Sequence, residues 1–230
     1  MKTAALYRLM TWLSPAFPVG AYTHSGGLEW AVHEHLVVMR TGLVEWIADV
    51  LVSGNCRSDA LFFAHAYEAA ASGDSGRLLE IAEFAAALHP SRERRLEATA
   101  QGAAFRRIAS ATADCPGLSH LTPLDDDMLS YPIVVATLAA GHDVPLASAL
   151  TAYLHALVSN LVSAAQRLIP LGQTDGQLAL AALQPIVATT VAETIGGLNH
   201  DLIEVLGSAT LMADFASLAH ETQYTRLFRT

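Results

Sequence analysis

The stretch VPLASALTAYLHALVSNLVSAAQ, residues 144–166, contains no charged residue and is long enough to span a bilayer. At about 100° per residue, leucines gather on one side of a helix and small polar residues on the other. The leucines are Leu150, Leu154, Leu157, Leu161 and Leu168, and the polar residues are Ser148, Thr151, His155, Ser159, Ser163 and Gln166. A helix between a core and polar neighbours needs such a stripe, whereas a lipid-bound helix does not. The pattern therefore predicts a buried helix of a soluble protein over residues 145–168.

The segments on either side also have helical spacing and are bounded by proline, glycine and capping residues. Further helices are predicted near residues 3–13, 25–38, 42–53, 58–72, 76–88, 92–111, 131–140, 175–194 and 201–218, the 175–194 helix being kinked or divided at Pro185. No β alternation persists and no internal repeat is present. The sequence therefore predicts an all-α protein with one multi-helix domain over residues 1–219 and a short polar and aromatic tail over residues 220–230.

The amino-acid composition excludes several classes of protein. Of the 230 residues, 52% are hydrophobic and 15% charged, which excludes a disordered chain and predicts extensive interfaces. The net charge is −9 and Lys2 is the only lysine, so phosphate-driven nucleic-acid binding is not expected. A Walker A loop also needs an internal lysine, so the chain is not a P-loop NTPase and should not bind GTP by itself.

The cysteines and the N-terminus favour a cytoplasmic protein. Cys56 and Cys115 form no C-x-x-C pair or secreted framework, which is typical of reduced cytosolic thiols. Arg8 interrupts the apolar N-terminal stretch, and its apolar residues have helical spacing. A signal peptide is therefore not expected.

Three features that suggest chemistry have simpler explanations. The string GDSG over residues 73–76 lies between two helical runs, where Asp74 or Ser75 would cap the next helix. Residues 125–127 are three aspartates, typical of a solvated loop before a helix. The isolated histidines His24, His89, His142, His200 and His220 lie near predicted helix ends and are expected to be solvated or capping. Neither a catalytic set, a cofactor site nor a preformed metal site is predicted, although imidazole, thiolate and carboxylate groups could contact nickel transiently.

Three unusual strings remain: SPAFPVGAY over residues 14–22, RLIPLGQTDGQ over 167–177 and HETQYTRLFR over 220–229. A fourth, SGGLE over 25–29, follows the first. Their order and spacing resemble the UreF family of urease accessory proteins nearly from end to end.

The resemblance implies an all-helical fold and a function. Proteins of this family dimerise and bind the accessory protein called UreD or UreH. That complex recruits the GTPase UreG, and the assembly helps to place nickel in apo-urease. Family members have no accepted catalytic activity and act as scaffolds that modulate the GTPase.

The candidate partner-binding residues come from the strings that carry the resemblance. They are Glu29, Gln173, Asp175, Gln223, Tyr224, Arg226, Phe228 and Arg229. By physics alone, Glu29 is more readily structural, near a helix N-terminus, and residues 173–175 supply capping groups. The tail is expected to be disordered or loosely packed alone and to become ordered on the UreD/UreH partner. In a helical turn, Tyr224 and Phe228 would lie on one side.

Two other classes stay open on the sequence. One is a helical metalloenzyme that uses the scattered histidines and carboxylates. The other is a membrane-associated subunit built on the 145–168 helix.

Overall fold

The structure is a computed structural model that describes residues 2–230. Within this range the chain forms α-helices and short 3-10 helices and no strand, which confirms the predicted all-α fold. The α-helices are α1 (Thr3–Trp12), α2 (Leu28–His33), α3 (Arg40–Ser53), α4 (Asn55–Ser72), α5 (Ser75–Ala87), α6 (Arg92–Thr112), α7 (Tyr131–Gly141), α8 (Leu146–Leu168), α9 (Gln173–Gly196), α10 (Leu202–Val205) and α11 (Leu211–His220). The 3-10 helices are η1 (Ala21–Thr23), η2 (Pro116–Leu121) and η3 (Asp126–Met128).

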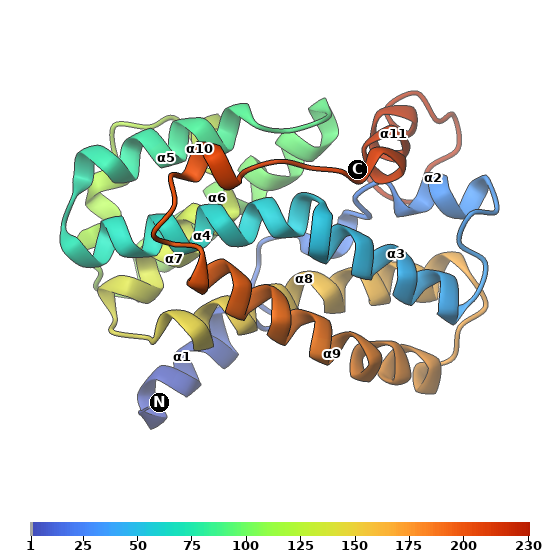
Figure 1. Cartoon of the computed structure of the whole chain (residues 1–230), viewed down its shortest axis with the longest axis horizontal. Helices are drawn as coiled ribbons and strands as arrows, with labels where there is room; N and C mark the ends of the chain where they lie inside the picture. The colour runs from blue at the N-terminus through green and yellow to red at the C-terminus, as the bar shows by residue number, and fades with distance from the viewer. Residues whose placement is uncertain (1) are drawn as a thin grey trace.

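Helix α7 forms the centre of the core. Every residue from Tyr131 to Ala140 is buried, as expected for a helix that is apolar on all sides. It packs most extensively against α4, which crosses the middle of the molecule, and also against α6 and α8 (Figure 1). The other helices are arranged around this pair.

Helix α8 has the predicted two-sided character. Leu150 and Leu154 are fully buried, whereas Thr151 and His155 on the other side are exposed. Helices α8 and α9 are each long and apolar enough to cross a membrane by length and composition alone, a test that the core helices of soluble proteins also pass. Here they pack against each other, and α9 also packs along α3.

Two helices differ from the prediction. The helix expected over 25–38 is only α2, because Gly26 and Gly27 have φ values of 61° and 87° and are therefore outside helical geometry. A Cβ on Gly27 would lie 2.7 Å from the backbone nitrogen of Ser217, so this glycine also allows α11 to approach. The helix expected over 201–218 is divided into α10 and α11. The connection between them is extended, and its Ala209 N–H donates to Ser53 O at 2.8 Å.

The predicted helix caps at Asp74 and Ser91 are confirmed. The Asp74 side chain caps α5 by accepting from Arg77 N–H at 3.0 Å, and Ser91 caps α6 by accepting from Arg94 N–H at 3.1 Å. Helix α9 continues through Pro185, so this proline does not divide it.

The C-terminal region lies far from the N-terminus in Figure 1, beside α2. Helix α11 contacts both α2 and α6, so the tail that follows it reaches the first turns of these two helices. The candidate site is built at this junction.

Candidate functional site

Four ionisable side chains meet where the tail leaves α11. Glu29 comes from the first turn of α2, Glu93 from the first turn of α6, His220 from the end of α11, and Arg226 from the tail. We call these four residues the tail clamp. Both glutamates are nearly buried and His220 is completely buried.

His220 lies between the two carboxylates. Its Nδ1 is 2.6 Å from a Glu93 oxygen and its Nε2 is 3.0 Å from a Glu29 oxygen. Each ring nitrogen is within hydrogen-bond distance of one carboxylate oxygen, so a proton on either nitrogen can be donated to a glutamate. The Arg226 guanidinium supplies a positive charge by donating to Glu93 at 2.7 Å. Both buried carboxylates are therefore hydrogen-bonded and Glu93 is also ion-paired, a condition for burying such groups at an acceptable energetic cost.

Glu29 also holds the tail backbone. Its oxygens accept from Leu227 N–H at 2.6 Å and from Phe228 N–H at 2.9 Å. The tail is irregular and cannot satisfy these groups within a helix, and an unsatisfied buried N–H is costly. The carboxylate thus replaces the partners that a helix or sheet would have supplied.

The last residue is bound to the loop before α2. Thr230 O accepts from Ser25 N–H at 2.7 Å, and the Thr230 hydroxyl lies 2.8 Å from His24 Nδ1 and 3.2 Å from Glu97. Burial lowers the pKa of His24, although the negative charge of Glu97 opposes this shift. A neutral imidazole can share its hydrogen bond with the threonine hydroxyl.

Phe228 connects the three strings that the sequence singled out. Its side chain is 3% exposed, and the Arg167 guanidinium carbon lies 4.4 Å from the ring centroid, in cation–π geometry. Arg167 also donates to Tyr22 O at 2.7 Å. Residues from the first, second and third strings therefore contact one another at one place.

This packing corrects the expectation for the tail. The tail is not loosely packed in the isolated chain, because Phe228 and Thr230 are buried and the clamp binds its backbone. It is not helical, and Tyr224 is fully exposed while Phe228 is buried, so the two rings do not share a side. Burial of the Phe228 side chain and the hydrogen bonds of the tail backbone to Glu29 oppose the entropy that favours disorder.

The candidate residues divide into three groups. Glu29, Arg226 and Phe228 form part of the clamp or its immediate surroundings, and Arg229 N–H donates to Thr23 O at 2.8 Å. Tyr224 points to solvent, and Gln223 donates to Thr225 O within the tail. Gln173 and Asp175 begin α9 and do not join them.

The start of α9 also differs from the prediction. None of the side chains of residues 173–175 caps the helix, and Gly172 is the N-cap residue. Asp175 instead forms a half-exposed ion pair with Arg40 at 3.0 Å, a contact of small expected energy.

Sequence reasoning missed His220 and Glu93. His220 was expected to be solvated or capping, but it is the most buried group of the clamp, and His24 is buried as well. The signal for Glu93 was the capped start of α6, where Glu93 and Glu97 follow Ser91. The clamp partners of Glu93 lie more than 100 residues away, at separations of 127 and 133 residues. No local pattern could pair them.

No metal site is found in the part of the chain that the structure describes. Among residues 2–230, no group of three His, Cys, Asp or Glu side chains could hold a metal ion. In the tail clamp, His220, Arg226 and two backbone N–H groups contact the two carboxylates. The clamp is arranged to hold the tail and offers no free base or nucleophile.

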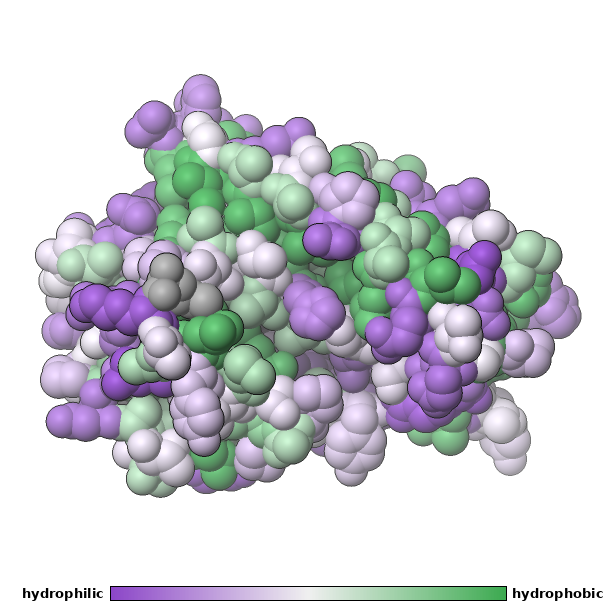
Figure 2. Space-filling view, turned by 90° about the horizontal axis from the view of Figure 1, so that it is seen from below, coloured by the Kyte–Doolittle hydropathy of each residue, from purple (hydrophilic) through white to green (hydrophobic). Residues whose placement is uncertain are grey.

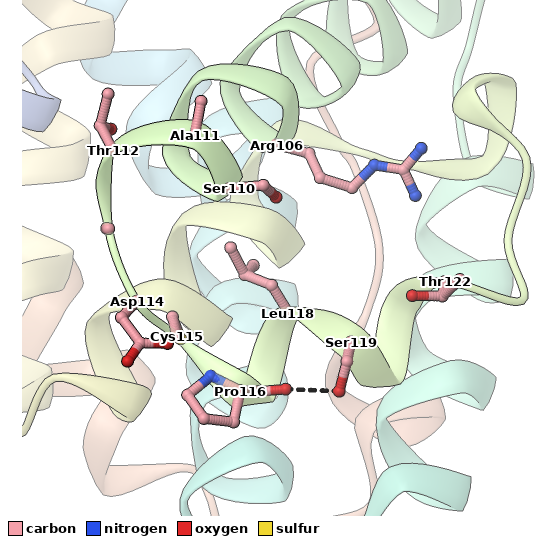
Figure 3. A pocket seen from close by; sticks show the side chains of 11 residues that line it. Arg106, Ser110, Ala111, Thr112, Asp114, Cys115, Pro116, Leu118, Ser119 and Thr122 are labelled. Atoms are coloured by element: carbon pink, nitrogen blue, oxygen red, sulfur yellow. Dashed lines mark hydrogen bonds between the residues drawn. The ribbon is translucent and has the colours of Figure 1, made fainter.

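A groove of about 740 Å³ lies at the end of α6 beside η2 (Figure 3). Arg106 borders it, but its guanidinium donates to Leu121 O and Leu124 O at 3.5 Å and pairs with Asp126. Burial raises the pKa of the neighbouring Cys115 thiol, which disfavours the reactive thiolate. Arg106 and Cys115 of this groove are therefore not available for chemistry.

Behind the clamp, Arg94 of α6 is buried and pairs with Glu97, while the more distant Asp59 of α4 accepts the Tyr153 hydroxyl at 3.1 Å. Desolvation by burial raises the pKa of Asp59 to about 6.

Replacing Asp59 with asparagine is expected to stabilise the protein at neutral pH. The folded-state pKa lies above the unfolded value, so ionisation favours the unfolded chain and stability falls as pH rises from about 4 to about 6. Asp59→Asn keeps an acceptor for Tyr153 and removes this penalty, which is about 3 kcal/mol at pH 7. Urea denaturation of the parent and of Asp59→Asn between pH 4 and 8 measures the difference in the free energy of unfolding. Asp49→Asn, at an exposed position of α3, is the control. A variant no more stable than the parent at pH 7 would contradict the assignment.

Comparisons with known proteins show the family that the strings suggested. A family model described as UreF matches residues 37–184. The chain is 51% identical over 226 residues to "Urease accessory protein UreF" of Rhodopseudomonas palustris (strain BisA53), covering 98% of this chain and 93% of that protein. It is 50% identical over 228 residues to the protein of the same name from Bradyrhizobium sp. (strain ORS 278), covering 99% and 93%. These alignments cover nearly the full chain at half identity, well beyond the central region of the family model. The chain therefore belongs to the UreF family of urease accessory proteins.

Proposed function

We propose that this chain is a non-enzymatic scaffold of urease maturation. It binds the accessory protein UreD/UreH as a homodimer in the cytoplasm, and the complex recruits and modulates the GTPase UreG. The assembly supports GTP-dependent insertion of nickel into apo-urease. Family membership supports this role. The residues of the tail clamp contact one another and the tail backbone, which supports a structural rather than a catalytic role for them.

The observation that carries the proposal is the two-sided tail. Arg226 and Phe228 are held on the inside, while Tyr224 and Leu227 face outward, with exposed fractions of 102% and 64%. The clamp fixes the backbone that presents these two apolar side chains. A pre-ordered segment loses less entropy when it binds, so its exposed aromatic residue can contribute more to affinity.

Helix α11 extends this apolar surface toward the tail. Leu211, Met212, Phe215 and Leu218 are exposed at spacings of one, three and three residues, on one side of the helix. Hydrophobic patches among hydrophilic residues are also visible on the face shown in Figure 2. Exposed apolar area of this kind is typical of protein–protein contact.

The test is capture of UreD/UreH by a double variant, Tyr224→Ala with Leu227→Ala. Loss of a central aromatic anchor costs about 2 kcal/mol or more, so affinity should fall about 30-fold. The clamp does not use these side chains, so circular dichroism and the urea midpoint should be unchanged. Val52→Ala with Leu178→Ala, two exposed apolar residues of α3 and α9, is the matched control. Unchanged capture by the tail variant would refute the tail as the docking element.

A further inference from the structure

A cavity distinct from the groove at the end of α6 has Arg94 among its lining residues. Its volume is about 370 Å³, and it is enclosed by α4, α5, the first turn of α6, the start of α7 and the connection between α10 and α11. Phe62 and Phe84 form an aromatic wall, with ring centroids 5.6 Å apart in an edge-to-face arrangement. Leu88 and the 71% exposed Ile203 also line it and mark its opening to solvent. This volume suits one small planar group.

The charged groups of this cavity are negative in sum. Asp59 and Asp214 both line it, and neither forms an ion pair within residues 2–230. Asp59 accepts the Tyr153 hydroxyl, and Asp214 accepts the Ser208 hydroxyl at 3.3 Å. Arg94 also lines the cavity, but Glu97 already neutralises it through a salt bridge. Two carboxyl groups therefore lack a cation.

Two further polar atoms at the cavity have no partner. The Ser130 hydroxyl has none although Ser130 is 1% exposed, and His89 Nε2 has none either. Buried polar atoms are nearly always hydrogen-bonded in native proteins, so these two atoms are available to a group that enters the cavity.

We propose that this cavity binds a planar organic cation, a guanidinium or amidinium group on an apolar stem. Carboxylates accept pairs of N–H groups from such a cation in charge-assisted hydrogen bonds. The aromatic wall of Phe62 and Phe84 can pack against a flat cation, and the Ser130 hydroxyl and His89 Nε2 can accept its remaining N–H groups. The source is either an arginine side chain of a partner protein or a free small molecule.

Other ligand classes fit less well. The net negative charge opposes a carboxylate or phosphate, and the described residues do not converge as a metal-ligand set. Burial raises the pKa of Asp59 to about 6 and also raises that of Asp214, whereas burial lowers the pKa of His89 to about 4. At neutral pH Asp59 is therefore largely ionised and His89 is neutral, as a cation requires.

Calorimetric titration of the full chain with benzamidine at pH 7.5 tests the proposal. Saturable binding at one site is expected, with benzoate and benzyl alcohol, which share its shape but lack the cation, giving none. Asp59→Asn and Asp214→Asn should each weaken benzamidine binding at least tenfold, and Ser130→Ala several-fold. Asp49→Asn, an exposed acid on α3, should leave it unchanged.

The expected stability of Asp59→Asn separates a lost site from a lost fold. Binding that persists in Asp59→Asn and Asp214→Asn, benzoate binding of equal strength, or no saturation by benzamidine would each overturn the proposal. A competition arm identifies the source. If saturating benzamidine displaces UreD/UreH, a partner arginine occupies the cavity, whereas undisturbed capture with specific binding assigns it to a free small molecule.

Discussion

Replacing Glu29 with alanine is expected to lower the free energy of unfolding by about 3–5 kcal/mol, because one partner of a buried ionic cluster is removed. His220 loses one of its two carboxylates, and the N–H groups of Leu227 and Phe228 lose their acceptor. For a chain of this size the melting temperature should fall by roughly 10 °C. Scanning calorimetry and urea denaturation measure the effect.

The same substitution should release the tail. Limited proteolysis of Glu29→Ala is expected to cleave after Arg226 or Arg229, which the parent protects. Glu34→Ala removes an exposed carboxylate from the end of the same helix and is the matched control. If Glu29→Ala kept the parent's stability and its protected tail, the clamp would not hold the tail. Because the docking surface depends on an ordered backbone, capture of UreD/UreH should also weaken.

Replacing Gly102 with alanine is expected to destabilise the protein by at least about 3 kcal/mol, at the upper end of the cost of overpacking. A Cβ at this position of α6 would lie 1.8 Å from Leu129 O and 2.8 Å from Leu129 C. Backbone atoms cannot rotate away as a side chain can, so α6 and the start of α7 must separate. The gain in helix propensity from alanine, about 1 kcal/mol, is too small to compensate.

Gly196→Ala is the matched control for this prediction. It lies at the end of α9 with no atom within 4 Å of the added Cβ, so the same change should be neutral or mildly stabilising. The urea midpoints of the two variants should therefore move in opposite directions or by very different amounts. Equal stability of Gly102→Ala and the parent would show that α6 and α7 do not pack as closely as described.

The expectations that succeeded rest on local signals. Asp74 and Ser91 cap the helices that follow them, and the buried leucines of α8 face the core. These features depend on residues within one or two helical turns, so spacing and residue type are sufficient to predict them. The expected helix over 25–38 failed because the two successive glycines adopt left-handed conformations beside α11.

The candidate site depends on contacts between residues far apart in the sequence, which local patterns do not predict. The strings that carry the family resemblance contained Glu29, Arg226 and Phe228, so the sequence indicated part of the site. It could not indicate that His220 lies between Glu29 and Glu93, which are 191 and 127 residues away. A charged residue in sequence is equally consistent with a solvated surface and with a buried pair. Only the arrangement of helices decides between them.

The sequence by itself determined the helical class, most helix boundaries, the family and the absence of a phosphate-binding lysine, because each depends on residue type and short spacing. The tertiary structure decided the state of the tail. Its composition predicts a mobile segment, but α2, α6 and α11 bring two carboxylates and an imidazole together beside it. Charges buried together are stable only when they are paired and hydrogen-bonded, and the tail supplies Arg226 and the two N–H groups that complete the set.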